Sequence, residues 1–255
     1  MAKLEVLEGL AQTEIIVIPI IDVSGSMSGE RIGAVNDAMR EVPGQLLDIN
    51  DDSLEAELLI APMEFSSGAR WFNLTGNKPS KVDSFRWIDM KASGLTDLGA
   101  AFKLLNEKLT TEEKGGWMKG RGGAAPVIIL ISDGGPTDDY QKELAQLKKR
   151  GWFRAALKFA VAVSEADKSV LAEFTGNSEA VIDTEVIRKD LASIIKTVVV
   201  SASRTVSSNV SVSSQENNND RIVTEEGPEL DEQVQQEAID NIKDQLTIDD
   251  SDDFF

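Results

Sequence analysis

The residues best suited to chemistry carry side-chain oxygens and lie in three short loops: Asp22, Ser24 and Ser26 in the first, Thr96 in the second and Asp133 in the third. Hard divalent cations such as Mg²⁺ take oxygen ligands in near-octahedral geometry and usually keep some water. The alternation in the first loop lets its three oxygens face one point, and the other two loops can complete the shell. The sequence therefore predicts a metal site for Mg²⁺, or for Mn²⁺ or Ca²⁺, formed by these five residues.

The composition of this ligand set predicts what the site would do. Three of the five side chains are neutral hydroxyls, so two carboxylates are left to balance a divalent ion. Such an ion would gain from one more anionic ligand supplied from outside. The set therefore favours a protein-binding module that engages an Asp or Glu of a partner.

Composition excludes several other functions. The 255-residue chain has no cysteine and no histidine, which removes thiol nucleophiles, imidazole catalysis and structural zinc sites. Its formal net charge of −18 offers no basic footprint for nucleic acid. No run of 18 apolar residues predicts a membrane span, and acids at Glu5 and Glu8 interrupt any secretory signal. We therefore expect a cytoplasmic protein that contacts neither nucleic acid nor membrane.

An enzyme is the weaker alternative. Asp22 follows an apolar strand, as does the aspartyl-phosphate nucleophile of haloacid-dehalogenase folds, which would make this a metal-dependent phosphatase. That chemistry needs a second Asp two residues on, and Ser24 stands there instead. The chain also lacks the glycine-rich loop of P-loop nucleotide hydrolases. We therefore predict that the protein is not an enzyme.

The elements that must position these loops alternate along the chain. Continuous or β-branched apolar runs predict strands at 15–21, 58–65, 69–74, 127–131, 157–163 and 180–182. Helical periodicity predicts helices at 32–49, 96–109, 136–151, 167–174 and 188–200, the first kinked or split at Pro43–Gly44. This order predicts an α/β fold: a Rossmann-like, doubly wound, mostly parallel sheet with one antiparallel edge strand and helices on both faces.

The composition changes near Ser201, which predicts one domain at 1–202 and an acidic Ser/Asn-rich tail at 203–255. The tail has 14 acidic side chains against three basic ones, which favours disorder. The alternative is a short amphipathic helix near 229–246 that folds on contact with a partner. A structural subunit with a vestigial metal site, binding through this tail, is accordingly a second functional hypothesis.

The three loops together resemble a known family. D-x-S-x-S at 22–26, G-x-T-x-x-G at 94–99 and S-D-G at 132–134 are similar, in that order, to the metal-ion-dependent adhesion site of von Willebrand factor A (vWA) domains, a resemblance that covers about residues 12–202. It implies that Ser24, Ser26 and Thr96 are direct ligands and that Asp22 and Asp133 act directly or through water.

Residues 126–138 most resemble the bacterial TerY-type vWA proteins associated with tellurite resistance, although Gly135 stands where those usually have an acid. That resemblance implies an intracellular stress-response protein whose partners include a Ser/Thr kinase and a PP2C-type phosphatase. The chain would then be a scaffold or a target in such a system.

Overall fold

The computed structural model describes residues 12–52, 56–119, 123–164, 166–184, 191–216 and 232–248. Within them a single mixed sheet forms the centre, with strand order β4-β3-β1-β6-β7-β8. The strands are β1 (Thr13–Asp22), β2 (Ala56–Ile60), β3 (Met63–Ser66), β4 (Gly68–Trp71), β5 (Ser80–Lys81), β6 (Val127–Ser132), β7 (Leu157–Ala162) and β8 (Val181–Asp183). β1, β2, β3, β6, β7 and β8 run parallel, whereas β4 pairs antiparallel with β3 at the edge and the two-residue β5 pairs antiparallel with β2. The predicted mostly parallel sheet with an antiparallel edge strand is confirmed.

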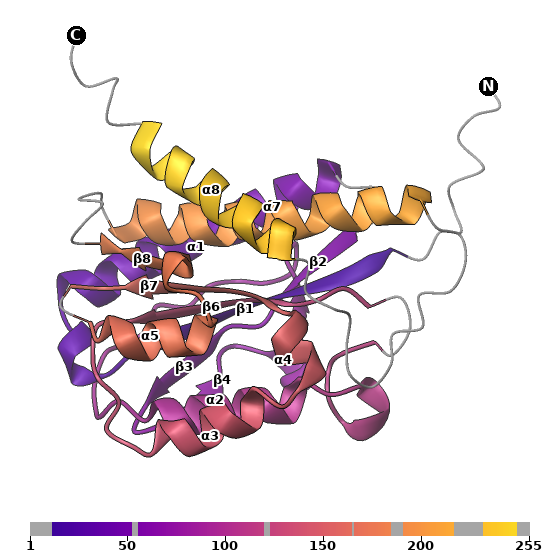
Figure 1. The fold of residues 1–255 in the computed structure, drawn as a ribbon. Coiled ribbons are helices and arrows are strands. Elements are labelled where there is room, and N and C mark those ends of the chain that lie inside the picture. Colours follow the sequence, from indigo (N-terminus) through magenta and orange to yellow (C-terminus); the bar gives the residue numbers. More distant parts are fainter. Residues whose placement is uncertain are drawn as a thin grey trace, which may run out of the picture.

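Helices cover both faces of the sheet (Figure 1). One face carries α1 (Glu30–Asp52), α7 (Leu191–Glu216) and α8 (Glu232–Ile248). The other carries α2 (Leu98–Lys108), α3 (Tyr140–Leu147), α4 (Gly151–Ala155) and α5 (Lys168–Thr175). Short 3₁₀ turns join some of these elements: η1 (Gly25–Met27), η2 (Thr75–Asn77), η3 (Glu112–Lys114) and η4 (Ser178–Ala180).

The central strand β1 shows why the fold needs both helical layers. Its side chains alternate between the faces, so Ile15, Val17 and Ile21 pack toward α1 and α7. Ile16, Ile18 and Ile20 pack toward α2, α3 and α5 on the other side. Each of these six is at most 5% exposed. A strand that is apolar at every position is stable only when both of its faces are covered.

Prolines interrupt the sheet where the sequence predicted one strand at 58–65. The structure has two strands there, β2 beside residues 13–17 of β1 and β3 beside residues 20–22. Pro62, between them, has no amide hydrogen to donate. Val17 O accepts from Ala61 N at 2.9 Å, so the backbone of Val17 faces the segment between β2 and β3. Pro19 lies two residues further along β1 and faces the same side, where it has no amide hydrogen to donate. The two prolines together explain the break.

Two helix boundaries differ from the predictions. α1 runs unbroken through Pro43, which lies buried inside it, so of the kink or split predicted at Pro43–Gly44 the split does not occur. The helix expected from residue 136 begins at Tyr140. Asp138 lies before it and accepts from Gly99 N at 2.9 Å and Ala100 N at 3.0 Å. Asp138 therefore caps the start of α2, a long-range role that sequence spacing does not reveal.

The C-terminal region differs most from expectation. α7 continues across residue 202 to Glu216, and α8 is a helix that packs on α7 (Figure 1). Ala238, Ile239, Ile242 and Leu246 of α8 are at most 2% exposed, so its apolar stripe lies against this chain. The structure thus has helix rather than disorder at 203–216 and 232–248, and α8 lies where the alternative placed a short helix near 229–246. The predicted disorder at 217–231 and 249–255 lies outside the described residues.

Two further contacts tie α8 down: Ser201 Oγ donates to Gln245 at 2.7 Å, and Lys243 pairs with Glu179 of η4 at 2.9 Å. The division at 202/203 into domain and tail stays a prediction. In the part of the chain that the structure describes, no helix combines the length and the apolar character that a membrane span requires.

Candidate metal site

Three loops meet at the carboxyl end of the parallel strands, beside β1. The chain leaves β1 toward β2 and β3 on one side and later returns as β6 on the other, so β1 is the point where strand order changes direction. Crevices at such points are where open α/β sheets bind ligands. Ile21 of β1 is in register with Ile131 of β6, which brings Asp22 beside Ser132.

Asp22 is the most enclosed of the five predicted ligands, at 0% exposure. Its Oδ1 accepts from Ser24 N at 2.8 Å, and its Oδ2 accepts from Ser132 Oγ at 2.6 Å. Burial raises the pKa of Asp22, because desolvation outweighs the hydrogen bonds from Ser132 and Ser24 that lower it, and nearby Asp133 raises it further. A cation bound next to this carboxylate would therefore stabilise its charged form.

The hydroxyl groups link Asp22 to the second carboxylate. Ser24 Oγ lies 3.0 Å from Ser26 Oγ, and Ser26 Oγ donates to Asp133 Oδ1 at 2.7 Å. The backbone of η1 bends to permit this, with Met27 N donating to Ser24 O at 3.1 Å. The structure thus brings the first and third loops together through their side-chain oxygens.

Thr96 reaches the same place from the second loop. An ideal Cβ on Gly134 would lie 3.7 Å from Ser26 Oγ and 3.8 Å from Thr96 Oγ1, so both hydroxyls face this glycine. Thr96 is 7% exposed, and among the described residues its hydroxyl has no hydrogen-bond partner. That unused oxygen is the position in the cluster freest to bind a ligand.

Backbone contacts hold the three loops in place. Gly25 N donates to Gly94 O at 3.0 Å, and Thr137 N donates to Thr96 O at 2.8 Å. Gly94 has φ +87°, and a Cβ there would lie 2.7 Å from Ser67 Oγ, so only glycine fits. These hydrogen bonds connect all three loops, so the spacing of the oxygens depends on the sheet rather than on one flexible segment.

Sequence reasoning missed Arg31 and the role of Ser132. Arg31, on the first turn of α1, pairs with Asp133 through Nη1, which also donates to Ser26 O at 3.0 Å. A helix N-terminus is the end that disfavours a cation, and the pairing with Asp133 offsets this. Ser132, at the end of β6, could have been found from its place beside Asp22 in a parallel pair.

The donors fit a hard divalent cation. Five oxygen-bearing side chains, two carboxylates and three hydroxyls, meet at the carboxyl end of β1 and β6, and the chain has no thiol or imidazole to offer. Nowhere in the described segments do three or more Asp or Glu side chains gather into a purely acidic metal site. Charge for such an ion is therefore limited to Asp22 and Asp133. The role of all five as ligands stays a prediction.

Residues 16–198 match the family described as von Willebrand factor type A domain. Because this match spans most of the chain, the protein belongs to the vWA family. Domains of this family are generally protein-interaction modules. No curated protein matches the sequence at a significant level.

Solved structures share the fold at low sequence identity. They include a von Willebrand factor type A protein from Catenulispora acidiphila (15% identity, 78% of this chain and 43% of that one, TM-score 0.52). Proximal thread matrix protein 1 from the mussel byssus, with a zinc-occupied MIDAS motif, is similar at 16% identity (74% and 47%, TM-score 0.53). The ArnB paralog VWA2 from Sulfolobus acidocaldarius aligns at 16% identity (75% and 46%, TM-score 0.51). This chain spans less than half the length of these three.

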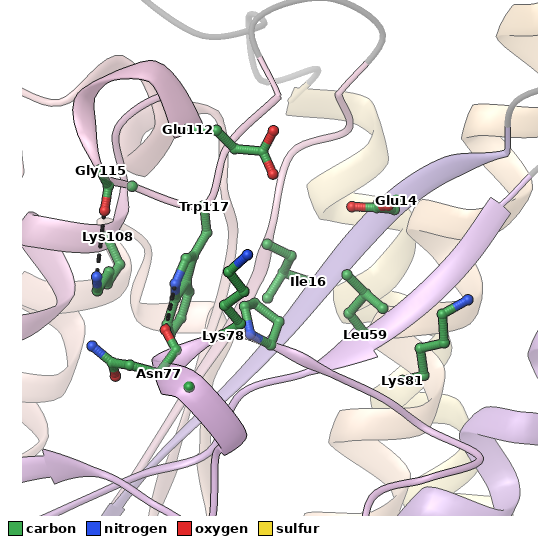
Figure 2. Close-up of a pocket in the computed structure, with 13 residues that line it drawn as sticks. Glu14, Ile16, Leu59, Asn77, Lys78, Lys81, Lys108, Glu112, Gly115 and Trp117 are labelled. Atoms are coloured by element: carbon green, nitrogen blue, oxygen red, sulfur yellow. Dashed lines mark hydrogen bonds between the residues drawn. The ribbon is translucent and has the colours of Figure 1, made fainter.

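A second hollow, of about 690 Å³, lies at the opposite end of the strands (Figure 2). Ile16, Leu59 and the Trp117 indole form its apolar wall, and lysines and glutamates surround them. Several of its charged groups are engaged: Lys119 pairs with Glu14 and Lys81 with Glu57, each at 2.6 Å, and Lys108 donates to Gly115 O at 3.3 Å. Among the described residues, its lining brings together no set of carboxylates and hydroxyls comparable to that at the carboxyl end.

Proposed function

We propose that this protein is a cytoplasmic, non-enzymatic binding module that uses a divalent cation at Asp22, Ser24, Ser26, Thr96 and Asp133 to engage a carboxylate of a partner protein. The same chemistry serves any partner that presents an accessible Asp or Glu.

The observation that carries the proposal is the chemistry of the cluster. Three hydroxyls and two carboxylates from three loops lie close together at the switch point of the sheet. Arg31 already pairs with one of the carboxylates, so the protein supplies less negative charge than would balance a divalent ion. An anionic group from outside would complete the balance.

The proposed cation is Mg²⁺, with Mn²⁺ or Ca²⁺ as alternatives. Each accepts oxygen ligands, and a set with three neutral hydroxyls favours no strict choice among them. The zinc-occupied MIDAS motif of the mussel protein supports divalent-ion binding by this fold. Zn²⁺ therefore belongs in the same titration, although imidazole and thiolate, its common ligands, are absent from this chain.

The proposed setting is a bacterial stress-response system of the tellurite-resistance type, with a Ser/Thr kinase and a PP2C-type phosphatase as partners. Its support is the similarity of residues 126–138 to TerY-type proteins. Purified candidates of these two classes would be tested first for cation-dependent capture by this chain, with EDTA as the control. Equal capture with and without EDTA would contradict the mechanism.

The cation site itself is tested by thermal melting and calorimetry with Mg²⁺, Mn²⁺, Ca²⁺ and Zn²⁺, on the wild type and on Asp22→Ala. An ion that binds only the folded state raises Tm by mass action. We expect a rise in the wild type that Asp22→Ala removes. The absence of any rise in the wild type at millimolar ion would refute the proposed site.

The acidic surface of α8 favours a second candidate function, binding through the C-terminal region. Glu237, Asp240 and Asp244 are exposed while the apolar side of α8 is buried on α7. Truncation would uncover that apolar contact, so neutralising the exposed acids is the cleaner test. Partner capture that survives Asp22→Ala but fails in Glu237→Gln/Asp240→Asn/Asp244→Asn would favour this alternative.

A further inference from the structure

The Arg31 guanidinium lies beside the proposed metal site, so a bound cation would bring a second positive charge close to it. Its Nη1 contacts Asp133 Oδ2 and donates to Ser26 O at 3.0 Å, and its Nη2 donates to Ser164 Oγ at 3.2 Å. The guanidinium is therefore held from three sides, by η1, by the loop after β6 and by the loop after β7. The Asp133 side chain is fully buried, whereas that of Arg31 is 40% exposed.

Arg31 and a bound cation would draw on the same carboxylate. Asp133 Oδ1 accepts from Ser26 Oγ at 2.7 Å, and Oδ2 is the atom that Arg31 contacts. Both oxygens thus have partners before any ion arrives. Like charges held within a few ångströms of each other, beside a fully buried carboxylate, repel, and Arg31 stays charged at every physiological pH.

The position of Arg31 on its helix adds to this antagonism. It lies on the first turn of α1, where the partial positive charge of the helix terminus disfavours a cation. The pairing with Asp133 offsets that cost in the absence of a metal ion. An ion bound to Asp133 would weaken the ion pair between Arg31 and Asp133, so this pair and the binding of the ion oppose each other.

We propose that Arg31 is a positioning residue that lowers the cation affinity of the site by competing for Asp133, so that tight cation binding depends on an added anionic ligand. The inference rests on the proposed cation site. It departs from the simpler expectation that every residue hydrogen-bonded to a ligand supports ion binding. It predicts the opposite sign: removing Arg31 strengthens cation binding.

The test is Mn²⁺ binding measured by calorimetry on the full chain, for wild type, Arg31→Gln and Arg31→Lys. We expect Arg31→Gln to bind Mn²⁺ at least about tenfold more tightly than wild type, a change of about 1.4 kcal/mol. Arg31→Lys keeps the charge, so its Kd should stay within about threefold of the wild-type value. A merely structural role would change Tm in EDTA without tightening Kd.

Arg40→Gln is the matched control. Arg40 lies on the same helix and pairs with Asp37 and Asp89, away from the site, so its loss should leave the Mn²⁺ Kd unchanged. An equal gain in Arg40→Gln would show that net charge alone acts, and would overturn the assignment. Unchanged or weaker binding in Arg31→Gln would overturn it too.

The two proposals fail in distinguishable ways. Wild-type binding that Asp22→Ala removes, together with no gain in Arg31→Gln, keeps the cation site and rejects the competition. Binding in Arg31→Gln but not in the wild type would support the competition and would refute the cation site as one that works in the wild-type chain alone. No binding in either would reject both.

Discussion

The two ends of the central strands hold charge in different ways. At the carboxyl end, Asp22 is buried, accepts hydrogen bonds from Ser24 N and Ser132 Oγ and has no cationic partner among the described residues, whereas Asp133 has Arg31. At the amino end, Lys158 is buried near the start of β7 and donates to the carbonyl oxygens of Phe153 at 3.0 Å and Ala156 at 2.7 Å. Lys158 therefore closes the C-terminus of α4, where the helix dipole favours a cation.

The two ends differ in whether the buried charge still lacks a partner. The donors of Lys158 point at helix carbonyls, and beside the hollow at the same end Glu14 pairs with Lys119 and Lys81 with Glu57. The carboxyl end instead keeps a buried carboxylate and, among the described residues, a hydroxyl without a partner at Thr96. The buried charge is satisfied internally at one end and left for a ligand at the other.

The largest contrast is expected when one carboxylate at each end of the strands is replaced by alanine. Asp133→Ala should abolish the stabilisation by Mn²⁺, which in the wild type reaches about 2.7 kcal/mol at 100 times Kd. Glu14→Ala, in the hollow at the amino end, should keep it. Chemical denaturation with Mn²⁺ and with EDTA checks both, each variant against its own EDTA value. Loss of the effect in Glu14→Ala would break the contrast between the ends.

The buried lysine gives a pH dependence of known sign. Burial lowers the pKa of Lys158 from 10.5 to about 8, so between these values the unfolded chain binds more protons than the folded one. Stability should therefore rise with pH across that window, by about 1–3 kcal/mol, since the carbonyl contacts oppose desolvation. Urea denaturation at pH 7.5, 9 and 10.5 measures it, with Lys158→Met as the reference.

In that reference the rise should vanish. An identical pH profile for Lys158→Met and wild type would mean that other groups, such as Tyr140, whose pKa is raised chiefly by burial, dominate the window. Tyr140 acts with the opposite sign, because a folded-state tyrosine that holds its proton longer loses stability as pH increases.

A smaller effect is expected from the neutral ligands. Ser26→Ala and Thr96→Ala should each weaken Mn²⁺ binding about tenfold, or about 1.4 kcal/mol, because one oxygen is lost while both carboxylates remain. The fold should persist, since neither side chain supports the core. Calorimetry checks the affinity, and Ser28→Ala, an exposed serine beside the same loop, should bind as the wild type does.

The smallest effect belongs to the hollow at the amino end. Lys78→Ala should leave the Mn²⁺ affinity unchanged and the free energy of unfolding within about 0.5 kcal/mol, because Lys78 is exposed on the rim. The same calorimetric and urea measurements apply. A larger loss of stability would show that this end, too, depends on an uncompensated charge.

Much of the fold followed from local patterns. The strands at 15–21 and 127–131 are apolar throughout because both of their faces are covered, and that pattern is visible without a structure. The five oxygen-bearing residues were recognisable because each loop directly follows a strand or precedes a helix. In a parallel sheet, such loops must gather at one end.

Long-range contacts decided the rest. The stripe on α8 was visible as an alternative, but its burial on α7 depended on which surface α7 left uncovered. Acidic composition argued for disorder, and the burial of Ile239 and Ile242 outweighed it. Propensity and composition describe segments in water, whereas the packed chain offers them apolar partners.

The sequence by itself determined the layered α/β fold, the end of the sheet that holds the oxygens and the kind of ion they suit. The tertiary structure alone decided that Arg31 meets Asp133, that Asp138 caps α2 rather than α3 and that α8 rests on α7. Periodicity and loop order are properties of neighbouring residues. A contact between residues 102 positions apart, such as that of Arg31 with Asp133, exists only once the sheet has set the direction in which each loop leaves it.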